Sequence, residues 1–426
     1  MSVLGLDVGT SATKGVLLDD GGRVLAQDRR GYRVRVPEHG RSELPAPRVW
    51  VAVRRAIASL AAAGERAGSP VRAVCVGGSG DEVVATDARG RAVGPVIMTP
   101  DRRSAAEGVA LAAAEGADAL FRRTGLWDLG VTPMARWRWM GRQRPADAAR
   151  VARLLSWPEW VMTRLGLPAM VDPTLAARTL AYDLATGTYA DATDRASLAG
   201  LLSPIVPTGT LVDAIPAARA DSVGLRPGTR YVVGGFDQAM ASLGAGAIEA
   251  GVAHDGNGSW EALSMRVPRD VIDDRLRTWC WSVGPAASGP HVEVMASWLA
   301  GLARPRPGMA PESAYAGLAD RLAGAIRQLA ELGLPVARIR ATGGGAASDD
   351  WLQRKADATG LLVERPATRQ AGALAAAILA GSAIDLLPPV EDAVRAHATV
   401  EARFEPRPEG APPGGRQGVP APPSAR

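Results

Sequence analysis

The sequence predicts an α/β protein of two domains with a central cleft, and three observations point to this fold class. The chain has 426 residues, too many for one ordinary core, so two domains of roughly 200 residues each are expected. Segments with strand periodicity alternate with segments of helical periodicity along most of its length. Glycine-containing turns at residues 9–11, 234–235 and 343–345 lie far apart in the sequence, as expected of loops that meet in a cleft.

The first strands are predicted to form a hairpin meander. Residues 3–8 have the pattern of a buried strand, residues 13–18 follow as its partner, and an Asp-x-x-Gly turn at 19–22 leads to a third strand. The same order returns with strands at 71–76 and 83–86, again followed by an Asp-x-x-Gly turn. Because such turns are common between any two strands, the repeat indicates only β-meanders mixed with helices.

The rest of the chain is predicted to alternate between helices and strands. Helices are expected at residues 48–63, 105–114, 158–165, 238–246, 314–332, 349–359 and 371–380. Strands are expected at residues 229–235, 251–254, 260–266 and 338–342. Ser348 is the expected N-cap of the helix that Gly360 ends, and Gly381 is expected to stop the last helix.

The predicted domain division places an N-terminal domain at residues 1–222 and a C-terminal domain at residues 223–403. The strand at 229–235 is expected to open the second half. Residues 404–426 are mostly Pro, Gly and Arg with almost nothing apolar to bury, so they are expected to form a disordered tail.

Composition argues for a soluble protein of a reducing compartment. The two cysteines, Cys75 and Cys280, give no disulfide framework, and no leader of charged then apolar residues opens the chain. No apolar run approaches the roughly 20 residues that a membrane span needs. We therefore expect a cytoplasmic protein with no membrane partner.

The net charge of +5 raises the question of nucleic acid. The lysines are Lys14 and Lys355, and arginine is scattered along the whole chain. Basic and aromatic residues alternate at residues 136–144, but an amphipathic helix, with Arg138 and Arg142 on its polar face, explains this stretch at least as well. We expect no nucleic-acid partner.

The glycine turns suit phosphate, because consecutive N–H groups in a turn form a pocket for anions. Asp7 leads the first turn and can hold a hydrated magnesium ion. Lys14 follows it and can reach phosphate oxygens as a point charge. The sequence thus predicts ATP and Mg²⁺ as cofactors.

Four segments stand in an informative order along the chain. They are Asp7-Val-Gly-Thr-Ser-Ala-Thr-Lys14, Gly234-Gly-Phe-Asp-Gln238, Gly256-Asn-Gly-Ser-Trp-Glu261 and Gly343-Gly-Gly-Ala-x-Ser348-x-x-Trp351-x-Gln353. They resemble the first phosphate motif, the catalytic segment, the second phosphate motif and the adenosine motif of the FGGY carbohydrate kinases, within the actin, hexokinase and Hsp70 ATPase superfamily. Residues 154–166 and 178–183 also look like interior family segments, so the likeness covers residue 3 to about residue 400.

The resemblance implies two ribonuclease-H-like domains of the actin-like ATPase kind, with ATP and a sugar meeting in the cleft. It implies transfer of the γ-phosphoryl group of ATP to a sugar or polyol hydroxyl. Asp237 would be the catalytic base that accepts the proton of the attacking hydroxyl. The structural alternative is that Asp237 caps the helix that follows it.

The resemblance also assigns residues to the nucleotide. Those expected to bind ATP and its phosphates are Gly9, Thr10, Ser11, Lys14, Gly258, Ser259, Gly343, Gly344, Gly345, Ala346 and Gln353. The last glycines would let adenosine lie against the backbone, with Gln353 near the base. Asp7 and Asp237 are expected to hold the metal. The structural alternatives are a hydroxyl-capped turn for Thr10 and Ser11 and a hairpin turn around Ser259.

The residues expected to bind the sugar are Asp81, Glu82, Asp101, Arg103, Asp237, Gln238 and Trp260. Carboxylates and Arg suit this role because they form paired hydrogen bonds with vicinal hydroxyls. Surface charge is the alternative for Glu82, Asp101 and Arg103. Trp260 would stack on a sugar face, and the alternative is a core position on its strand.

Departures from the family pattern leave the substrate open. Gly80-Asp81-Glu82 stands where xylulokinase-like members usually carry Gln-Met-His. Glu82 resembles the residue that glycerol kinases have at this place. Trp260-Glu261 resembles deoxyhexulose kinases such as those for rhamnulose and fuculose. We expect a ketose of the xylulose, ribulose or deoxyhexulose type, with glycerol or another polyol as an alternative.

The segment between Trp298 and Ile339 is shorter than in typical members and lacks their Gly-Glu-Arg motif. This keeps a second hypothesis open, a nucleotide-binding regulator on the same scaffold without phosphotransfer. A homodimer is the expected assembly, with its contacts unassigned.

Overall fold

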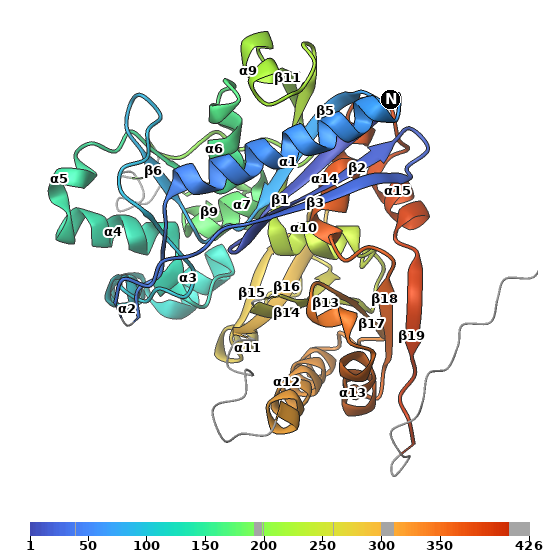
Figure 1. Ribbon diagram of the computed structural model, residues 1–426. Coiled ribbons are helices and arrows are strands. Elements are labelled where there is room, and N and C mark those ends of the chain that lie inside the picture. The colour runs from blue at the N-terminus through green and yellow to red at the C-terminus, as the bar shows by residue number, and fades with distance from the viewer. Residues whose placement is uncertain (39, 191–197, 199, 259, 300–310, 409–426) are drawn as a thin grey trace, which may run out of the picture.

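A computed structural model describes residues 1–38, 40–190, 198, 200–258, 260–299 and 311–408. Two large β-sheets dominate it, one in the upper and one in the lower part of Figure 1. Two helices, α10 (Asp237–Gly244) and α14 (Ala371–Ser382), pack on each other. α10 also contacts strands of both sheets, which places this pair of helices between them.

In the described residues the first sheet has six strands. In spatial order they are β11 (Leu211–Ala214), β12 (Arg230–Phe236), β5 (Val71–Gly78), β1 (Ser2–Val8), β2 (Ala12–Asp19) and β3 (Val24–Gly31). β12, β5 and β1 run parallel, and the other neighbours are antiparallel.

Helices cover both faces of the first sheet, which explains why β1 is buried along its whole length. Successive side chains of a strand point to opposite faces. Leu4 and Leu6 therefore pack in one cluster with α1 (Ala46–Arg66), while Val3 packs in another with α14. A strand buried on both faces reads as an unbroken apolar run.

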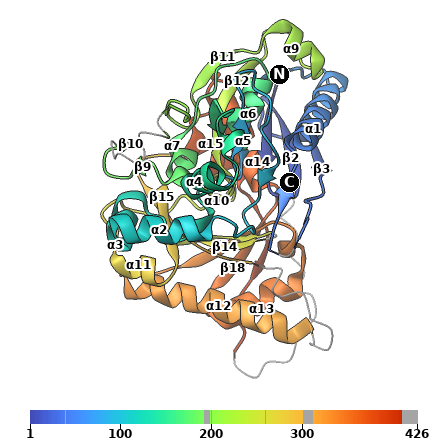
Figure 2. The same cartoon turned by 90° about the vertical axis from the view of Figure 1, so that its left-hand side faces the viewer.

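The second sheet has seven strands. In spatial order they are β15 (Trp281–Pro285), β16 (Val292–Leu299), β14 (Trp260–Val267), β13 (Val252–Asn257), β17 (Arg338–Thr342), β18 (Leu362–Pro366) and β19 (Val400–Phe404). The helices α12 (Pro311–Glu331) and α13 (Asp349–Thr359) pack against each other and cover its outer face (Figures 1 and 2).

The remaining elements are short. Three strand pairs are β4 (Glu43–Leu44) with β7 (Val96–Ile97), β6 (Val84–Thr86) with β8 (Arg153–Leu155), and β9 (Tyr182–Asp183) with β10 (Thr188–Tyr189). The helices are α2 (Ala105–Glu115), α3 (Ala117–Thr124), α4 (Pro133–Gln143), α5 (Pro145–Ala148), α6 (Trp157–Arg164), α7 (Pro173–Ala176), α9 (Ala217–Ser222), α11 (Asp274–Thr278) and α15 (Val390–His397). Single 3₁₀ turns are η1 (Leu129–Val131), η2 (Ala177–Thr179) and η4 (Gly345–Ala347).

The first predicted meander is confirmed, and the second is wrong. β1, β2 and β3 pair in sequence as expected. β6 instead leaves the large sheet and pairs with β8, because the parallel neighbours β1 and β12 occupy both edges of β5.

The strand predicted at residues 229–235 to open the second half of the chain is β12, and it lies in the first sheet. β12 pairs in parallel with β5 and so belongs to the first sheet. Its core, Tyr231 to Val233, is buried, as suits an interior parallel strand. The chain that follows β12, including α10, therefore starts from the first sheet.

The helix ends are partly as predicted. Ser348 caps α13 by accepting a hydrogen bond from the Trp351 N–H at 3.2 Å, and Gly360 follows with φ +68°. Gly381 does not stop α14, which continues to Ser382. A Cβ at Gly381 would lie 2.5 Å from a Leu387 methyl, so this glycine serves close packing.

Among the described residues, no helix combines the length and apolar character needed to cross a bilayer. Most of the predicted tail, residues 409–426, lies outside the described residues.

Candidate active site

The turn between β1 and β2 places a carboxylate beside an ammonium group. Asp7 pairs with Lys14 in the antiparallel register, and Lys14 Nζ donates a hydrogen bond to Asp7 Oδ2 at 3.1 Å. The Gly9 N–H donates to the Ala12 carbonyl at 3.2 Å, and the Tyr32 hydroxyl donates to the Gly9 carbonyl. Within the part of the chain that the structure describes, Asp7 Oδ1 is buried without a hydrogen-bond partner. Such an atom is costly unless a cation or donor satisfies it.

Asp237 is the first residue of α10, immediately after β12. The strand approaches its neighbour closely here, since a Cβ at Gly234 would lie 2.3 Å from the Val76 carbonyl oxygen. Phe236 is the N-cap residue of α10, and no side chain caps this helix. The interpretation of Asp237 as a helix cap is therefore wrong, and its carboxylate is left for another role.

Several charges act on Asp237 at once. Burial raises its pKa well above the usual range for Asp, and the negative charges of Asp7 and Glu82 raise it further. Lys14 acts in the opposite direction. The pKa of Lys14 is itself raised, chiefly by the charge of Asp7 and less by that of Asp237, against the effect of burial. Asp7, Lys14, Glu82 and Asp237 thus influence one another electrostatically.

Three elements converge near Asp7 and Asp237. A Cβ at Gly372, near the start of α14, would lie 3.5 Å from Asp7 Cγ and 3.7 Å from the Asp237 carbonyl oxygen. No side chain caps α14, and its first turn holds no acidic residue. The N–H groups at such a helix end favour anions. Thr10, which is half-buried, and Ser11, which is exposed, stand in the turn between β1 and β2.

The residues present fit a magnesium ion held partly by phosphate. Among the described residues, no group of three or more His, Cys, Asp or Glu side chains is placed to hold a metal. Mg²⁺ usually binds through one or two carboxylates, with waters and substrate phosphates completing its octahedron. The orphaned Oδ1 of Asp7 and the Asp237 carboxylate match that donor set.

Glu82, Asp101 and Arg103 are buried, so the interpretation of all three as surface charge is wrong. The side chains of Glu82 and Asp101 are 0% exposed, and that of Arg103 is 5% exposed. Glu82 Oε1 accepts hydrogen bonds from the Thr99 N–H and hydroxyl at 3.1 and 2.6 Å. Among the described residues, its Oε2 is buried without a hydrogen-bond partner.

Asp101 and Arg103, by contrast, are bound to each other. Arg103 Nη2 lies 2.6 Å from Asp101 Oδ2, and its Nη1 lies 2.9 Å from Glu43 Oε1. Asp101 Oδ2 also accepts the Ser42 N–H at 2.7 Å. The Arg103 guanidinium lies over the Trp139 ring, 5.2 Å from its centre. This pair is therefore built into the wall that holds Glu82.

Two arginines that the sequence did not indicate as site residues fix the Asp81–Glu82 segment. Arg178 Nη2 forms an ion pair with Asp81 Oδ1 at 2.7 Å and lies over the Phe236 ring. Arg136 donates to the carbonyls of Asp81 and Met98 and is 2% exposed. The helix predicted for residues 136–144 is confirmed by α4. Arg136 belongs to the buried first turn of α4, and no sequence signal distinguished it from the other arginines.

The loop predicted to be the second phosphate motif joins β13 to β14. The Gly258 N–H donates to the Trp260 carbonyl at 3.1 Å, while Ser259 lies outside the described residues. Trp260 is half-buried at the start of β14. A Cβ at Gly256 would lie 3.1 Å from Gln238 Oε1. The side chain of Gln238 thus reaches from α10 to this loop.

The loop at residues 343–345, predicted to bind adenosine, lies directly against Asn257 at the end of β13. Gly343 has φ +87°, and a Cβ there would lie 2.6 Å from the Asn257 carbonyl oxygen. A Cβ at Gly345 would lie 3.0 Å from Asn257 Cβ, whereas nothing lies within 4 Å of one at Gly344. Ala346 is buried. Gly344 is therefore the open position of this loop.

The side-chain amide of Gln353 is hydrogen-bonded within the protein. Its Nε2 donates to Asp357 Oδ1 at 2.9 Å and to the Glu405 carbonyl at 2.7 Å. Both amide hydrogens thus bind the protein itself. Its contact with an adenine base stays a prediction.

A buried lysine of α13 binds residues of β13 and β14. Lys355 is 0% exposed, and its Nζ donates to Asn257 Oδ1 and Glu261 Oε1, both at 2.6 Å, and to Asp255 Oδ2. Trp351 Nε1 donates to Asn257 Oδ1 at 2.9 Å. Burial raises the pKa of Glu261 to about 7, with Asp255 adding to this and Lys355 opposing it. Nothing in the sequence pointed to this cluster beyond the rarity of lysine.

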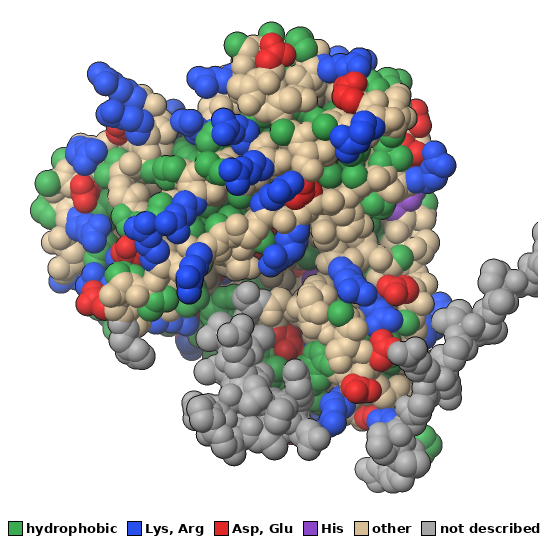
Figure 3. Space-filling model, in the orientation of Figure 1, with side chains coloured by type: hydrophobic (Ala, Val, Ile, Leu, Met, Phe, Trp, Pro, Cys, Tyr) green, Lys and Arg blue, Asp and Glu red, His purple; other side chains and the backbone are tan. Residues whose placement is uncertain are grey.

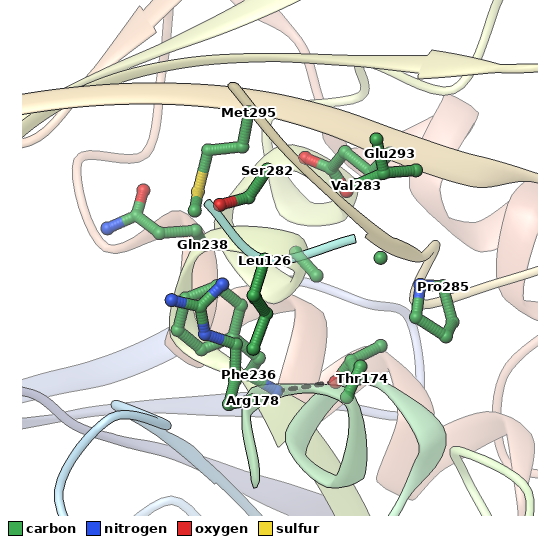
Figure 4. A pocket seen from close by; sticks show the side chains of 13 residues that line it. Leu126, Thr174, Arg178, Phe236, Gln238, Ser282, Val283, Pro285, Glu293 and Met295 are labelled. Carbon is green, nitrogen blue, oxygen red and sulfur yellow. Dashed lines mark hydrogen bonds between the residues drawn. The ribbon is translucent and has the colours of Figure 1, made fainter. Parts of the chain in front are cut away.

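A narrow cavity of about 30 Å³ lies behind Phe236 and Arg178. Figure 4 shows Gln238, Ser282 and Met295 on one side of it and Thr174 on another. Burial raises the pKa of Glu293, which also lines it, to about 7. The space suits about one water molecule, so it does not hold a sugar in this arrangement.

Comparison with known families gives two matches. The N-terminal domain of the FGGY family of carbohydrate kinases matches residues 2–244, and the C-terminal domain of the same family matches residues 297–384. Among curated relatives, a gluconokinase from Bacillus licheniformis is 24% identical over 447 residues, covering 88% of this chain and 86% of the relative.

Other relatives match only in part. A gluconokinase from Bacillus subtilis (strain 168) is 23% identical over 66% of this chain and 55% of its own length. An autoinducer-2 kinase from Klebsiella pneumoniae is 26% identical over 64% of this chain and 52% of its own. The chain thus spans about half the length of these relatives.

The fold matches solved kinases over nearly the whole chain. A ligand-bound xylulose kinase from Lactobacillus acidophilus superposes with a TM-score of 0.83 at 19% identity, covering 96% of this chain and 94% of that one. A glycerol kinase with ADP from Plasmodium falciparum gives a TM-score of 0.81 at 14% identity, covering 95% and 94%. The predicted fold of two actin-like ATPase domains is confirmed.

Proposed function

Since this chain belongs to the FGGY family of carbohydrate kinases, we propose that it transfers the γ-phosphoryl group of ATP to a hydroxyl of a sugar or polyol. The observation that carries the proposal is the meeting of Asp7, Lys14 and Asp237 at the uncapped start of α14. A carboxylate, a cation and free N–H groups in one place are what phosphoryl transfer requires.

Asp237 acts as the base in this proposal. Its raised pKa makes its carboxylate a better proton acceptor than an ordinary Asp. Lys14 neutralises charge on the phosphates, and the N–H groups at the start of α14 orient them. A magnesium ion bound at Asp7 would add charge stabilisation for the phosphates.

Glu82 holds the acceptor in place. Its Oε2 lacks a partner in the described residues, while its Oε1 is fixed by Thr99. The charge of Glu82 raises the pKa of Asp237, so the proposed acceptor site and the proposed base are electrostatically linked. Asp101 and Arg103 would support this wall and do not need to touch the sugar themselves.

The acceptor we favour is a ketose of the xylulose, ribulose or deoxyhexulose type, because Trp260 and Glu261 resemble the corresponding segment of deoxyhexulose kinases. The likeness to the gluconokinase from Bacillus licheniformis over most of both chains makes gluconate a second candidate. Glycerol is a further candidate acceptor, because Glu82 resembles the residue that glycerol kinases have at this place.

The test is a panel of ketoses, gluconate and polyols with magnesium-ATP, scored by release of ADP. We expect at least one ketose to be phosphorylated. Asp237→Asn should lower kcat/KM about 10²–10⁴-fold, the usual contribution of a general base, while ATP still binds. Absence of turnover on every compound, with ATP bound, would favour the regulator hypothesis instead.

A further inference from the structure

A second cavity of about 560 Å³ lies in the first half of the chain, apart from the candidate active site. Its size is within the usual range for small-molecule sites. Its walls come from the start of α1, the end of α6, the strand pair β4–β7 and the turn after β6. None of the residues assigned above to ATP or sugar lines it.

The cavity is rich in arginine. Arg35, Arg91 and Arg164 line it, and Glu43 is the acidic residue among its lining. Glu43 is already bound to Arg103 at 2.9 Å. Among the described residues, neither Arg35 nor Arg164 has a carboxylate partner, and Arg164 Nε is buried without a hydrogen bond. A buried donor without a partner is costly, and an anion in the cavity would satisfy it.

The start of α1 adds to this positive field. Pro45 is its N-cap residue, no side chain caps the helix, and its first turn holds no acidic residue. A helix of 21 residues carries a partial positive charge at this end. The uncapped end and the arginines therefore favour the same kind of ligand.

An apolar wall completes the site. Trp50 and Trp160 meet edge to face with ring centres 6.4 Å apart, and the Arg164 guanidinium lies over the Trp50 ring at 5.4 Å. Pro45, Pro47 and Pro95 line the same cavity. Rings and prolines offer a surface for a flat apolar group.

The same strand pair connects this cavity to the sugar side of the candidate active site. Glu43 of β4 lines the cavity and binds Arg103. Pro95 lines the cavity directly before β7. Just beyond β7, Thr99 binds Glu82, and Asp101 holds the Ser42 N–H. A ligand that moves β4–β7 would thus move Glu82.

We propose that this cavity binds a small ligand with an oxyanion, a phosphate or carboxylate, on a flat apolar body, and that its occupancy alters sugar binding. The second part of this proposal rests on the function proposed above. Basic side chains are also spread over the neighbouring face crossed by α1 (Figure 3), but the cavity is distinguished by its aromatic wall.

The binding test uses phenyl phosphate and benzoate, with neutral benzyl alcohol as the uncharged probe. Binding is followed by calorimetry and by tryptophan fluorescence, with magnesium-ATP present to fill the nucleotide site. We expect phenyl phosphate to bind more tightly than benzoate, and benzyl alcohol not to bind measurably. Arg164→Gln should weaken binding of phenyl phosphate at least tenfold, and Arg35→Gln should weaken it too.

The matched control is Arg321→Gln, an exposed arginine of α12 on the other sheet, which should bind phenyl phosphate as the wild type does. Failure of both anions to bind would overturn the proposal, as would equal affinity in the wild type and Arg164→Gln. An unchanged unfolding temperature in Arg164→Gln shows that the variant is folded.

The coupling is tested separately. Phenyl phosphate should change the KM for the sugar at least twofold in the wild type and not in Arg164→Gln. Binding without this change would overturn the regulatory part. Because calorimetry needs no turnover, failure of the kinase proposal and failure of the binding proposal are distinguishable.

Discussion

Two lysines of this chain sit beside carboxylates, and their surroundings give them different roles. Lys14 faces Asp7 and acts on Asp237 near an uncapped helix start, with 37% of its side chain exposed. Lys355 is 0% exposed and enclosed by carboxylates and amides of the protein. The first can meet a ligand, whereas the second can only hold the protein together.

Removing the charge of Lys14 should change the pH dependence of turnover. Lys14 lowers the pKa of Asp237, so Lys14→Gln leaves that pKa higher still. Because the base must be deprotonated, the acidic limb of kcat/KM should move to higher pH. At pH 7 kcat/KM should also fall about 10²–10³-fold, as for loss of a preorganised electrostatic group.

The control for Lys14→Gln is the conservative substitution Lys14→Arg. Lys14→Arg keeps the positive charge, so its pH profile should return toward that of the wild type even if its rate stays lower. Steady-state rates from pH 5 to 9 with a saturating metal concentration measure both. Identical midpoints in Lys14→Gln and the wild type would contradict the assignment.

Removing Lys355 should destabilise the fold. Lys355→Met leaves Asp255 and Glu261 buried without their cation, and breaking a buried pair in this way costs about 3–5 kcal/mol. The pKa of Glu261 is already raised to about 7, and Lys355 holds it down. In the variant it rises further, so the extra loss of stability relative to the wild type develops as pH rises through about 7, where Glu261 ionises in the wild type but stays protonated in the variant.

Urea unfolding from pH 5 to 8 tests whether the stability of Lys355→Met falls in this way as pH rises. The deficit in the free energy of unfolding of Lys355→Met relative to the wild type should be smaller at pH 5 and should grow from pH 7 to pH 8. Adding Glu261→Gln to Lys355→Met should recover part of the loss at pH 8. A deficit independent of pH would show that packing, and not charge, explains the effect.

Short turns were the elements best predicted from sequence. The Asp19 and Asp87 turns repeat in detail, since Gly22 and Gly90 each donate to the Asp carbonyl, at 3.0 and 2.9 Å. Their bonds lie within a few residues, so local sequence determines them. The sheet position of β6 depends on which distant strand is free to pair, and no local pattern contains that information.

The site residues also divide into those with a recognisable local sequence pattern and those that depend on contacts with distant residues. Asp7, Lys14 and Asp237 come from turns with recognisable local patterns, and the structure brings them together. Arg136 and Arg178 act through the backbone and side chain of Asp81, a contact between residues far apart in sequence. Arginines are so common in this chain that composition could not single them out.

α14 packs so closely on β1 that any side chain at position 5 should destabilise the fold. A Cβ there would lie 2.1 Å from the Ala373 carbonyl oxygen and 2.2 Å from the Ala377 nitrogen. These are backbone atoms of a buried helix and cannot rotate away. Gly5→Ala should therefore lower the free energy of unfolding by about 3 kcal/mol, the upper part of the usual cost of overpacking.

The control is another glycine changed to alanine. Gly141 lies in α4, is exposed, and has no atom within 4 Å of the position that a Cβ would take. Gly141→Ala should raise stability by about 1 kcal/mol, since alanine is the better helix former. Urea unfolding of both variants is the measurement. Equal stability of Gly5→Ala and the wild type would mean that α14 does not lie against β1.

At the scale of the whole molecule, the two halves of the sequence are interwoven. β12 forms hydrogen bonds with β5 of the first sheet, and α14 packs on β1, β2 and β5 of the same sheet. α14 also brings its start beside Asp7 and Asp237. The proposed domains 1–222 and 223–403 thus share a core, and the candidate active site forms only when both are present.

This interweaving predicts the behaviour of fragments. Residues 1–222 alone would lack β12 and α14, so one edge of β5 would be unpaired and the face of β1 that carries Val3 would be exposed. Exposed apolar faces and unpaired strand edges promote aggregation. The fragment should bind hydrophobic dyes and exchange its β1 and β5 amides rapidly, whereas the full chain should protect them.

Coexpression gives the matched comparison. Residues 1–222 made together with 223–426 should form a soluble complex that protects the β1 amides, because the second fragment supplies β12 and α14. If residues 1–222 alone gave protected β1 amides and a cooperative unfolding transition, the sheet would not need those elements. The first half would then be an independent domain, and Asp237 would reach the site only by docking of one domain on the other.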